Sequence, residues 1–135
     1  MARGIHSIEG IGPHYAEILK GVGITNIEHL LSAGASSKGR EELARKTGVS
    51  SKHILRWVNM CDLFRVRGVA SQYAELLEAV GVDTVKELRN RNPENLAEAM
   101  SKVNAEKQLV RALPNSKRVS DWIQHAKNLP PVVTY

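Results

Sequence analysis

Apolar residues recur at helical spacing along most of the chain, and short polar or glycine-containing stretches interrupt them. Positions i, i+3, i+4 and i+7 lie on one face of a helix, and the first stripe of this kind is formed by Tyr15, Ile18, Leu19 and Val22. A later helix face carries Ile54, Trp57, Val58 and Cys61. Nothing alternates with a period of two over five or more residues, as a half-buried strand would. The pattern therefore predicts an all-α protein without a sheet.

Residues that favour helix ends divide this pattern into short helices. Glycine ends helices because it adopts positive φ, whereas Ser and Asn side chains accept hydrogen bonds from the N–H groups at a helix start. The predicted N-terminal caps include Ser37, Ser50, Asn92, Asn104 and Ser116. The predicted helices span residues 13–22, 26–33, 37–47, 51–63, 71–80, 84–90, 93–102, 104–112 and 117–129.

The chain contains an internal repeat. Gly10–Leu19 matches Gly68–Leu77, with Tyr-Ala-Glu identical in both, and Trp57-Val58 matches Trp122-Ile123. The offset grows from 58 residues at the first match to 65 at the second, so the second copy is about seven residues longer. Such self-similarity predicts two copies of one structural unit, which we expect to pack together. The predicted parts are a first repeat at 1–65, a second repeat at 66–131 and a short tail at 132–135.

The first repeat contains a candidate binding turn, Gly10-Ile11-Gly12, directly before a predicted helix that begins at Pro13. The glycines permit a tight turn, and Ile11 is expected to anchor it in the core. The free N–H groups of the turn and of the first helical residues then point outward, at the positive end of the helix dipole. That arrangement suits a phosphate oxygen, although a Gly-x-Gly turn between packed helices also occurs as plain architecture.

Gly10-Ile11-Gly12-Pro13, followed by Ala16 and Ile18-Leu19, resembles the hairpin of the helix-hairpin-helix family. Proteins of that family grip the DNA backbone with little sequence preference, often through paired motifs. The resemblance implies that the amides of Gly10 and Gly12 bind phosphate and that His14 adds a side-chain contact.

A longer pattern resembles an uncharacterised bacterial family of small tandem helix-hairpin-helix proteins, a domain of unknown function without an assigned activity. This second resemblance covers nearly the whole chain. It is carried by Tyr15-Ala16-Glu17, Trp57-Val58, Tyr73-Ala74-Glu75-Leu76-Leu77, Asn104, Leu113-Pro114 and Trp122-Ile123.

The second hairpin, Gly68-Val69-Ala70, departs from the family pattern because Ala70 replaces the second glycine. If that position requires positive φ, alanine disfavours it, and the first hairpin is then the better candidate. Arg65 and Arg67 flank the second hairpin and offer compensation. A degenerate third hairpin at Gly48 leads into the helix that carries Lys52 and Arg56. The predicted nucleic-acid-binding residues are Gly10, Ile11, Gly12, His14, Gly48, Lys52, Arg56, Arg65, Arg67 and Gly68.

Composition and charge agree with a small binding protein. The formal net charge is +5, from 19 basic and 14 acidic residues among 135, which permits an anionic partner without demanding one. The densest basic run lies between Lys38 and Arg56, and a solvated face is its commoner interpretation. The single cysteine, Cys61, excludes an internal disulfide and agrees with a cytoplasmic location. No apolar run suits a membrane span, so we expect no membrane association.

Catalysis is not expected, because the five histidines are isolated and no nucleophile or metal-binding pattern is present. Glycosylases with this hairpin place a catalytic Asp soon after it, where Asp83 stands here, but an added domain to hold a flipped base is missing. We therefore predict no cofactor, no metal and no enzymatic activity. The predicted function is non-sequence-specific DNA binding, and the alternative is a protein–protein interaction module whose hairpins no longer touch DNA.

The repeat also suggests how the fold closes. The second hairpin follows the predicted helix 51–63, whereas no full helix precedes the first. Residues 117–129 correspond to that helix, so we hypothesise that they pack beside the first hairpin and close a pseudo-two-fold ring. A partner chain would otherwise supply the helix, which leaves the protein a monomer or a homodimer.

Overall fold

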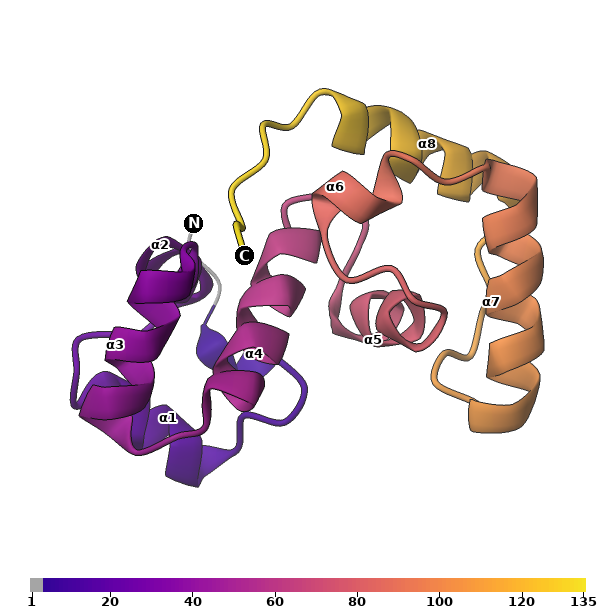
Figure 1. The fold of residues 1–135 in the computed structure, drawn as a ribbon. Helices are drawn as coiled ribbons and strands as arrows, with labels where there is room; N and C mark the ends of the chain where they lie inside the picture. The colour runs from indigo at the N-terminus through magenta and orange to yellow at the C-terminus, as the bar shows by residue number, and fades with distance from the viewer. Residues whose placement is uncertain (1–3) are drawn as a thin grey trace. The chain divides into compact units, whose positions relative to one another are not determined.

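The computed structural model describes residues 4–135, and within this range every regular element is helical (Figure 1). It contains eight α-helices and a 3-10 helix, η1 (Ile5–Ser7), and the only β-type pairing in the range is an isolated bridge between Gly4 and Asn26. The prediction of an all-α fold without a sheet is therefore confirmed.

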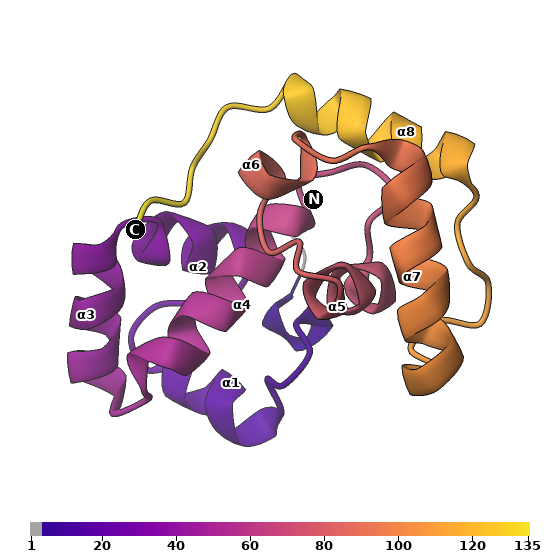
Figure 2. The same cartoon turned by 45° about the vertical axis from the view of Figure 1, so that its right-hand side comes forward.

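The chain divides into two compact units. Unit 1 consists of Met1–Asp62 with Val132–Tyr135, and unit 2 consists of Leu63–Pro131. Unit 1 holds η1 and the helices α1 (Pro13–Lys20), α2 (Ile27–Gly34), α3 (Ser37–Thr47) and nearly all of α4 (Ser51–Leu63). Unit 2 holds α5 (Ser71–Ala79), α6 (Val85–Leu88), α7 (Pro93–Lys107) and α8 (Ser116–Lys127). Within the units, α2 packs on α3 and α7 packs on α8 (Figures 1 and 2).

Each unit has its own small core around the helix that carries its tryptophan. In unit 1 the predicted face of α4 is confirmed, since Ile54, Trp57, Val58 and Cys61 are each at most 1% exposed. In unit 2 the corresponding face of α8 is buried in the same way, and it consists of Val119, Trp122, Ile123 and Ala126. Short helices of this length are marginal alone, so this burial is what stabilises them.

Polar side chains begin most of the helices. Six of the eight α-helices start at a residue whose side chain accepts a hydrogen bond from a backbone N–H three residues later, as expected of a cap. These capping residues are Asn26, Ser36, Ser50, Thr84, Asn92 and Asn115. The predictions of Ser50 and Asn92 are confirmed, whereas those of Ser37 and Ser116 are wrong by one residue. In both of the latter cases the preceding polar residue adopts the extended conformation and accepts the bond.

The predicted helices 93–102 and 104–112 are wrong in one respect, because α7 runs without a break to Lys107. Gln108 ends it in the left-handed conformation at φ 51°. Asn104 lies inside the helix rather than at a start. Its side chain accepts from the backbone N–H of Val110 at 3.0 Å and donates to the Val110 carbonyl at 3.1 Å. The asparagine thus fixes the loop after the helix instead of capping a new one.

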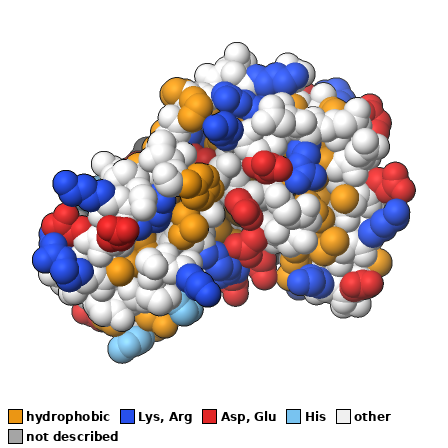
Figure 3. All heavy atoms as spheres, in the orientation of Figure 1, with side chains coloured by type: hydrophobic (Ala, Val, Ile, Leu, Met, Phe, Trp, Pro, Cys, Tyr) orange, Lys and Arg blue, Asp and Glu red, His pale blue; other side chains and the backbone are white. Residues whose placement is uncertain are grey.

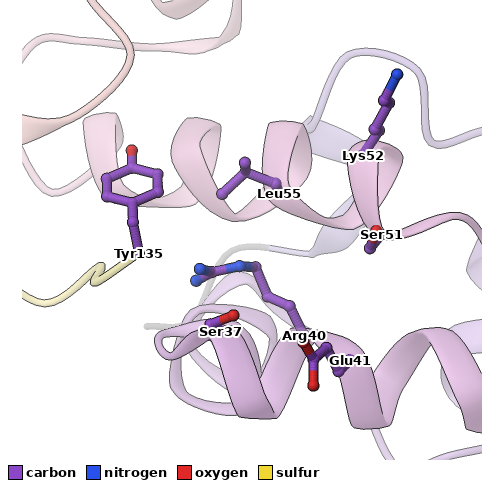
Figure 4. A pocket seen from close by; sticks show the side chains of 7 residues that line it. All are labelled: Ser37, Arg40, Glu41, Ser51, Lys52, Leu55 and Tyr135. Carbon is purple, nitrogen blue, oxygen red and sulfur yellow. The ribbon is translucent and has the colours of Figure 1, made fainter.

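One buried arginine helps to hold residues 132–135 in unit 1. Arg40 is 6% exposed, and its guanidinium donates to the carbonyls of Gly34 (2.8 Å), Ala35 (3.1 Å) and Thr134 (2.6 Å). The guanidinium carbon also lies 5.7 Å from the centre of the Tyr135 ring (Figure 4). The backbone N–H of Thr134 also donates to the Ala35 carbonyl at 2.8 Å. The segment predicted as a short tail is therefore a docked segment, and Arg40 is one of the residues that dock it. None of the helices in the described range has the length and apolar character needed to cross a membrane.

Candidate functional site

The two predicted hairpins have the same backbone geometry. Gly10 and Gly68 adopt positive φ, +93° and +89°, which only glycine adopts without strain. The apolar residue that follows is buried in both, with Ile11 at 5% and Val69 at 0% exposure. The N–H of this residue donates to the carbonyl three positions earlier, at 3.2 Å for Ile11 and 3.1 Å for Val69. Ile11 thus anchors the turn as predicted, and Val69 does the same in unit 2.

The second position of the hairpin does not require a glycine. Gly12 (φ −88°, ψ −174°) and Ala70 (φ −101°, ψ −177°) are both extended. Apart from Gly12 itself and its two chain neighbours, no described atom lies within 4 Å of where a Cβ on Gly12 would stand. Alanine at this position therefore causes no backbone strain. The second hairpin was expected to be the weaker candidate only if Ala70 required positive φ, and it does not.

The helices that follow the hairpins begin differently from all the others in the described range. Gly12 starts α1 and Ala70 starts α5, and neither start has a side-chain cap hydrogen bond. The first N–H groups of an α-helix have no partner inside the helix. Those of α1 and α5 are therefore left to solvent or to an external acceptor, at the end of the helix where the dipole favours an anion.

A tryptophan lies behind each hairpin. A Cβ built on Gly10 would stand 3.7 Å from the indole nitrogen Nε1 of Trp57, and one on Gly68 would stand 3.1 Å from Nε1 of Trp122. Both indoles are at most 2% exposed. Tyr15 packs on Trp57 with ring centres 5.0 Å apart, and Tyr73 packs on Trp122 at 5.3 Å. The tryptophans are core residues, as predicted, and do not offer stacking faces to bases.

Each hairpin is packed by the tryptophan helix of its own unit. In unit 2 the backbone N–H of Arg67 donates to Nδ1 of His125 on α8 at 2.9 Å. In unit 1 the place beside the first hairpin is filled by α4, where Arg56 Nη1 donates to the Glu9 carbonyl at 3.2 Å. The chain needs no partner helix for this role.

Most of the site residues predicted in the first half of the chain gather near the first hairpin. Arg56 is half-buried beside Gly10, with Nη1 3.2 Å from the position of a Gly10 Cβ. His14 is exposed in the first turn of α1, and its ring lies 5.5 Å from that of Tyr15. Lys52 is exposed one turn before Arg56 on α4 and extends away from Arg40 and Tyr135 (Figure 4).

Gly48 does not form a third hairpin of the expected kind. It ends α3 at φ +76°, and its N–H donates to the Ala44 carbonyl at 2.9 Å. The amide that was expected to meet a phosphate is therefore used inside the protein, and Gly48 acts as an ordinary helix C-cap.

The basic run from Lys38 to Arg56 does not form one basic face. Arg40 is buried against carbonyls, while Arg45 and Lys46 lie 3.4 and 3.5 Å from the Glu42 carboxylate. On the face that Figure 3 shows, basic and acidic side chains are interspersed. The positive charges of this run are therefore partly buried or paired with a carboxylate and do not form one continuous basic surface.

The second hairpin borders an open hollow of about 410 Å³. It is lined by Arg67, Gly68, Arg118, Asp121, Trp122 and His125. Arg67 was among the predicted site residues, and the neighbouring Arg65 donates to the Pro130 carbonyl at 2.6 Å. Arg118 and His125 were missed. The sequence contained one signal for this region. The offset of 65 residues between Trp57 and Trp122 aligns Lys117 with Lys52, a predicted site residue, and aligns Arg118 with His53.

Two groups have shifted pKa values, and neither lies in this hollow. Burial, with Asp62 and Glu28 nearby, raises the pKa of the Cys61 thiol far above its ordinary value. Partial burial, and then the negative charges of Glu78 and Glu87, raise the pKa of Asp83, which is exposed in the loop before α6. Within residues 4–135 no group of three or more His, Cys, Asp or Glu side chains is placed to hold a metal ion.

Comparison with known proteins gives one match. The family described as a domain of unknown function (DUF4332) matches residues 9–129, which include both hairpins and both tryptophan helices. No curated protein and no solved structure was found that matches the chain.

Proposed function

We propose that this chain, which belongs to the family described as a domain of unknown function (DUF4332), binds the phosphate backbone of DNA without reading base sequence. One observation carries the proposal. Among the eight helices of the described range, the two that follow a hairpin are the two whose starts have no side-chain cap. Both starts are built on the same turn, so the arrangement recurs in each unit.

The chemistry of these helix starts fits a phosphate oxygen. Their unpaired N–H groups and the positive end of the helix dipole favour an anion. The positive-φ glycine and its buried apolar neighbour hold the turn rigidly, so little ordering is needed on binding. Contacts of this kind position a protein on DNA but do not distinguish bases. The helix-hairpin-helix resemblance of the two turns supports the same ligand.

The binding role is proposed as non-catalytic and cofactor-free, with DNA as the main partner and the chain acting as a monomer or a homodimer. The single cysteine supports the reducing cytoplasm as the place of action. A bacterial source is supported by the family resemblance of the sequence alone.

Fluorescence anisotropy of labelled DNA duplexes tests the proposal. Two duplexes of equal length and unrelated sequence should bind with similar affinity. The logarithm of the binding constant should fall linearly with the logarithm of the salt concentration, with a slope of about −0.9 for each phosphate contact. A strong preference for one sequence would contradict backbone recognition.

Variants at the second hairpin position locate the contact. Gly12→Val and Ala70→Val place a larger side chain at the helix starts without backbone strain, since both positions are extended. We expect each to weaken binding while the circular dichroism spectrum stays helical. The control is Ala33→Val, at an exposed position on α2. Absence of binding by the unaltered protein at low salt would favour the protein–protein interaction module instead.

A further inference from the structure

The hollow beside the second hairpin is lined by cationic side chains and by the buried Trp122. We propose that it is the principal phosphate site of this protein and that Arg118 is the side chain that grips the phosphate, assisted by Arg67 and His125. The inference rests on the proposed function, because it names where and by which side chains the DNA backbone is held. It adds Arg118 and His125, which lie on α8, the helix that packs against the hairpin.

Arg118 is oriented before any ligand arrives. Its guanidinium carbon lies 4.9 Å from the centre of the Tyr73 ring and 5.8 Å from that of Trp122. Its Nη1 also contacts the Tyr73 hydroxyl at 3.3 Å. A guanidinium stacked on aromatic rings keeps its N–H edges available, and these match two phosphate oxygens at once. Tyr73 is itself fixed by donating to the Ala112 carbonyl at 3.0 Å.

The charges around the hollow are not neutralised from within. No carboxylate within residues 4–135 forms an ion pair with Arg67 or Arg118. The one acidic residue of the hollow, Asp121, lies 3.6 Å from the ammonium group of Lys117. Two arginines are thus left without an anionic partner at the edge of the hairpin, where a phosphate would supply one.

His125 adds a donor whose direction is set by the fold. Its Nδ1 accepts the backbone N–H of Arg67, so a neutral ring carries its proton on Nε2. The same hydrogen bond ties the hairpin to α8, which keeps Gly68 and Arg118 at the border of one hollow. The site is therefore assembled from two segments distant in sequence.

The equivalent place in unit 1 is less suited to an anion. The residue before the hairpin glycine is Glu9 in unit 1 and Arg67 in unit 2. The position of Arg118 is occupied by His53, whose ring lies 6.2 Å from Tyr15 and 6.1 Å from Trp57. Arg56 contributes one guanidinium there, and its Nη1 donates to the Glu9 carbonyl. The two units thus share the same hairpin and tryptophan packing but differ in the charged side chains around the hairpin.

Variants of the full chain test the assignment by anisotropy with a labelled duplex, and the test and control variants each remove one positive charge. Arg118→Gln should weaken binding by about tenfold at low salt and reduce the salt slope by about one, because one phosphate contact is lost. Arg118→Lys should recover only part of the affinity, since it keeps the charge and loses the planar fork. The control is Arg45→Gln, which removes the same charge from an arginine 75% exposed beside Glu42.

A gain of function gives the complementary test. His53→Arg installs in unit 1 the side chain that unit 2 has, and it should tighten binding and steepen the salt slope. If the unaltered protein binds DNA but Arg118→Gln behaves like Arg45→Gln, this assignment is overturned and backbone binding by the hairpins stands. If the unaltered protein does not bind at low salt, both proposals are overturned.

Discussion

The glycine that begins each hairpin should tolerate no side chain, and Gly68→Ala is the sharper case. At φ +89° an alanine is strained by roughly 1–2 kcal/mol. The new Cβ would stand 3.1 Å from Nε1 of Trp122, and this indole is only 2% exposed, so it has little room to move. Loss of glycine's extra freedom in the unfolded chain returns about 0.4–1 kcal/mol. Strain less this return leaves a loss of about 0–1.6 kcal/mol, and the tight contact with Trp122 brings the expected net loss of stability to about 1–2 kcal/mol.

Gly12→Ala is the matched control within the same motif. Position 12 is extended, and outside its two chain neighbours no described atom lies within 4 Å of the added Cβ, so the variant has neither the backbone strain nor the tight contact of Gly68→Ala. Its stability should stay within about 1 kcal/mol of the unaltered protein, because the gain from a less flexible unfolded chain opposes the poorer capping of α1 by alanine. Gly10→Ala should lie between them. Its φ is also positive, at +93°, but its nearest neighbour is the Nη1 of Arg56, the end of a flexible side chain.

Urea denaturation followed by circular dichroism and tryptophan fluorescence measures these differences. Gly12→Ala should lie within about 1 kcal/mol of the unaltered protein, Gly10→Ala should be less stable, and Gly68→Ala should be the least stable. Gly68→Ala should lie about 1–2 kcal/mol below the unaltered protein. If Gly68→Ala were as stable as Gly12→Ala, the shared hairpin geometry and its contact with Trp122 would be refuted.

Three further predictions concern other parts of the chain. Arg40→Met should cost about 2–3 kcal/mol because the carbonyls of Gly34 and Thr134 lose the donor recorded for them and that of Ala35 loses one of its donors. Hydrogen exchange of the Thr134 amide should accelerate, and unchanged protection would contradict the docking role of Arg40. The Cys61 thiol, 0% exposed and with its pKa raised by burial, should not react with Ellman's reagent at pH 8 until urea unfolds the chain; fast reaction of the native protein would count against that burial. Because the pKa of Asp83 is raised on folding, its protonated form favours the folded state, and this contribution is lost as pH rises through the folded pKa. Asp83→Asn should therefore stabilise the protein by less than about 1 kcal/mol at pH 7 and by nothing near pH 3, and urea midpoints that show the larger gain at pH 3 would reverse the sign.

The helices and the repeat could be predicted from the sequence because their signals are local. Apolar spacing identified the buried face of α4, and the shared Gly-apolar pattern identified two equivalent turns. Caps were harder to assign where two polar residues adjoin. Ser36 and Asn115 take the role expected of Ser37 and Ser116 because the residue that caps is the one left in the extended conformation. Nothing in the sequence distinguishes the neighbours.

Features that depend on tertiary contact could not be predicted in the same way. Asn104 resembles a helix cap, but its side chain meets the backbone of Val110 on the far side of a turn. The packing of each hairpin against a helix of its own unit depends on the path of the chain between them. Arg118 could not be predicted because a single arginine on a helix belongs to no sequence motif. Its proposed role depends on its contacts with the rings of Tyr73 and Trp122.

The central claim, that the hairpin amides meet a phosphate, is tested most directly by nuclear magnetic resonance on the ¹⁵N-labelled protein titrated with a short DNA duplex. The largest amide shifts should occur at Gly12, His14 and Tyr15 and at their counterparts Ala70, Gln72 and Tyr73. These shifts should saturate at low salt and fade as salt is raised. Binding with amide shifts confined to other segments, such as α3 or α7, would contradict the claim.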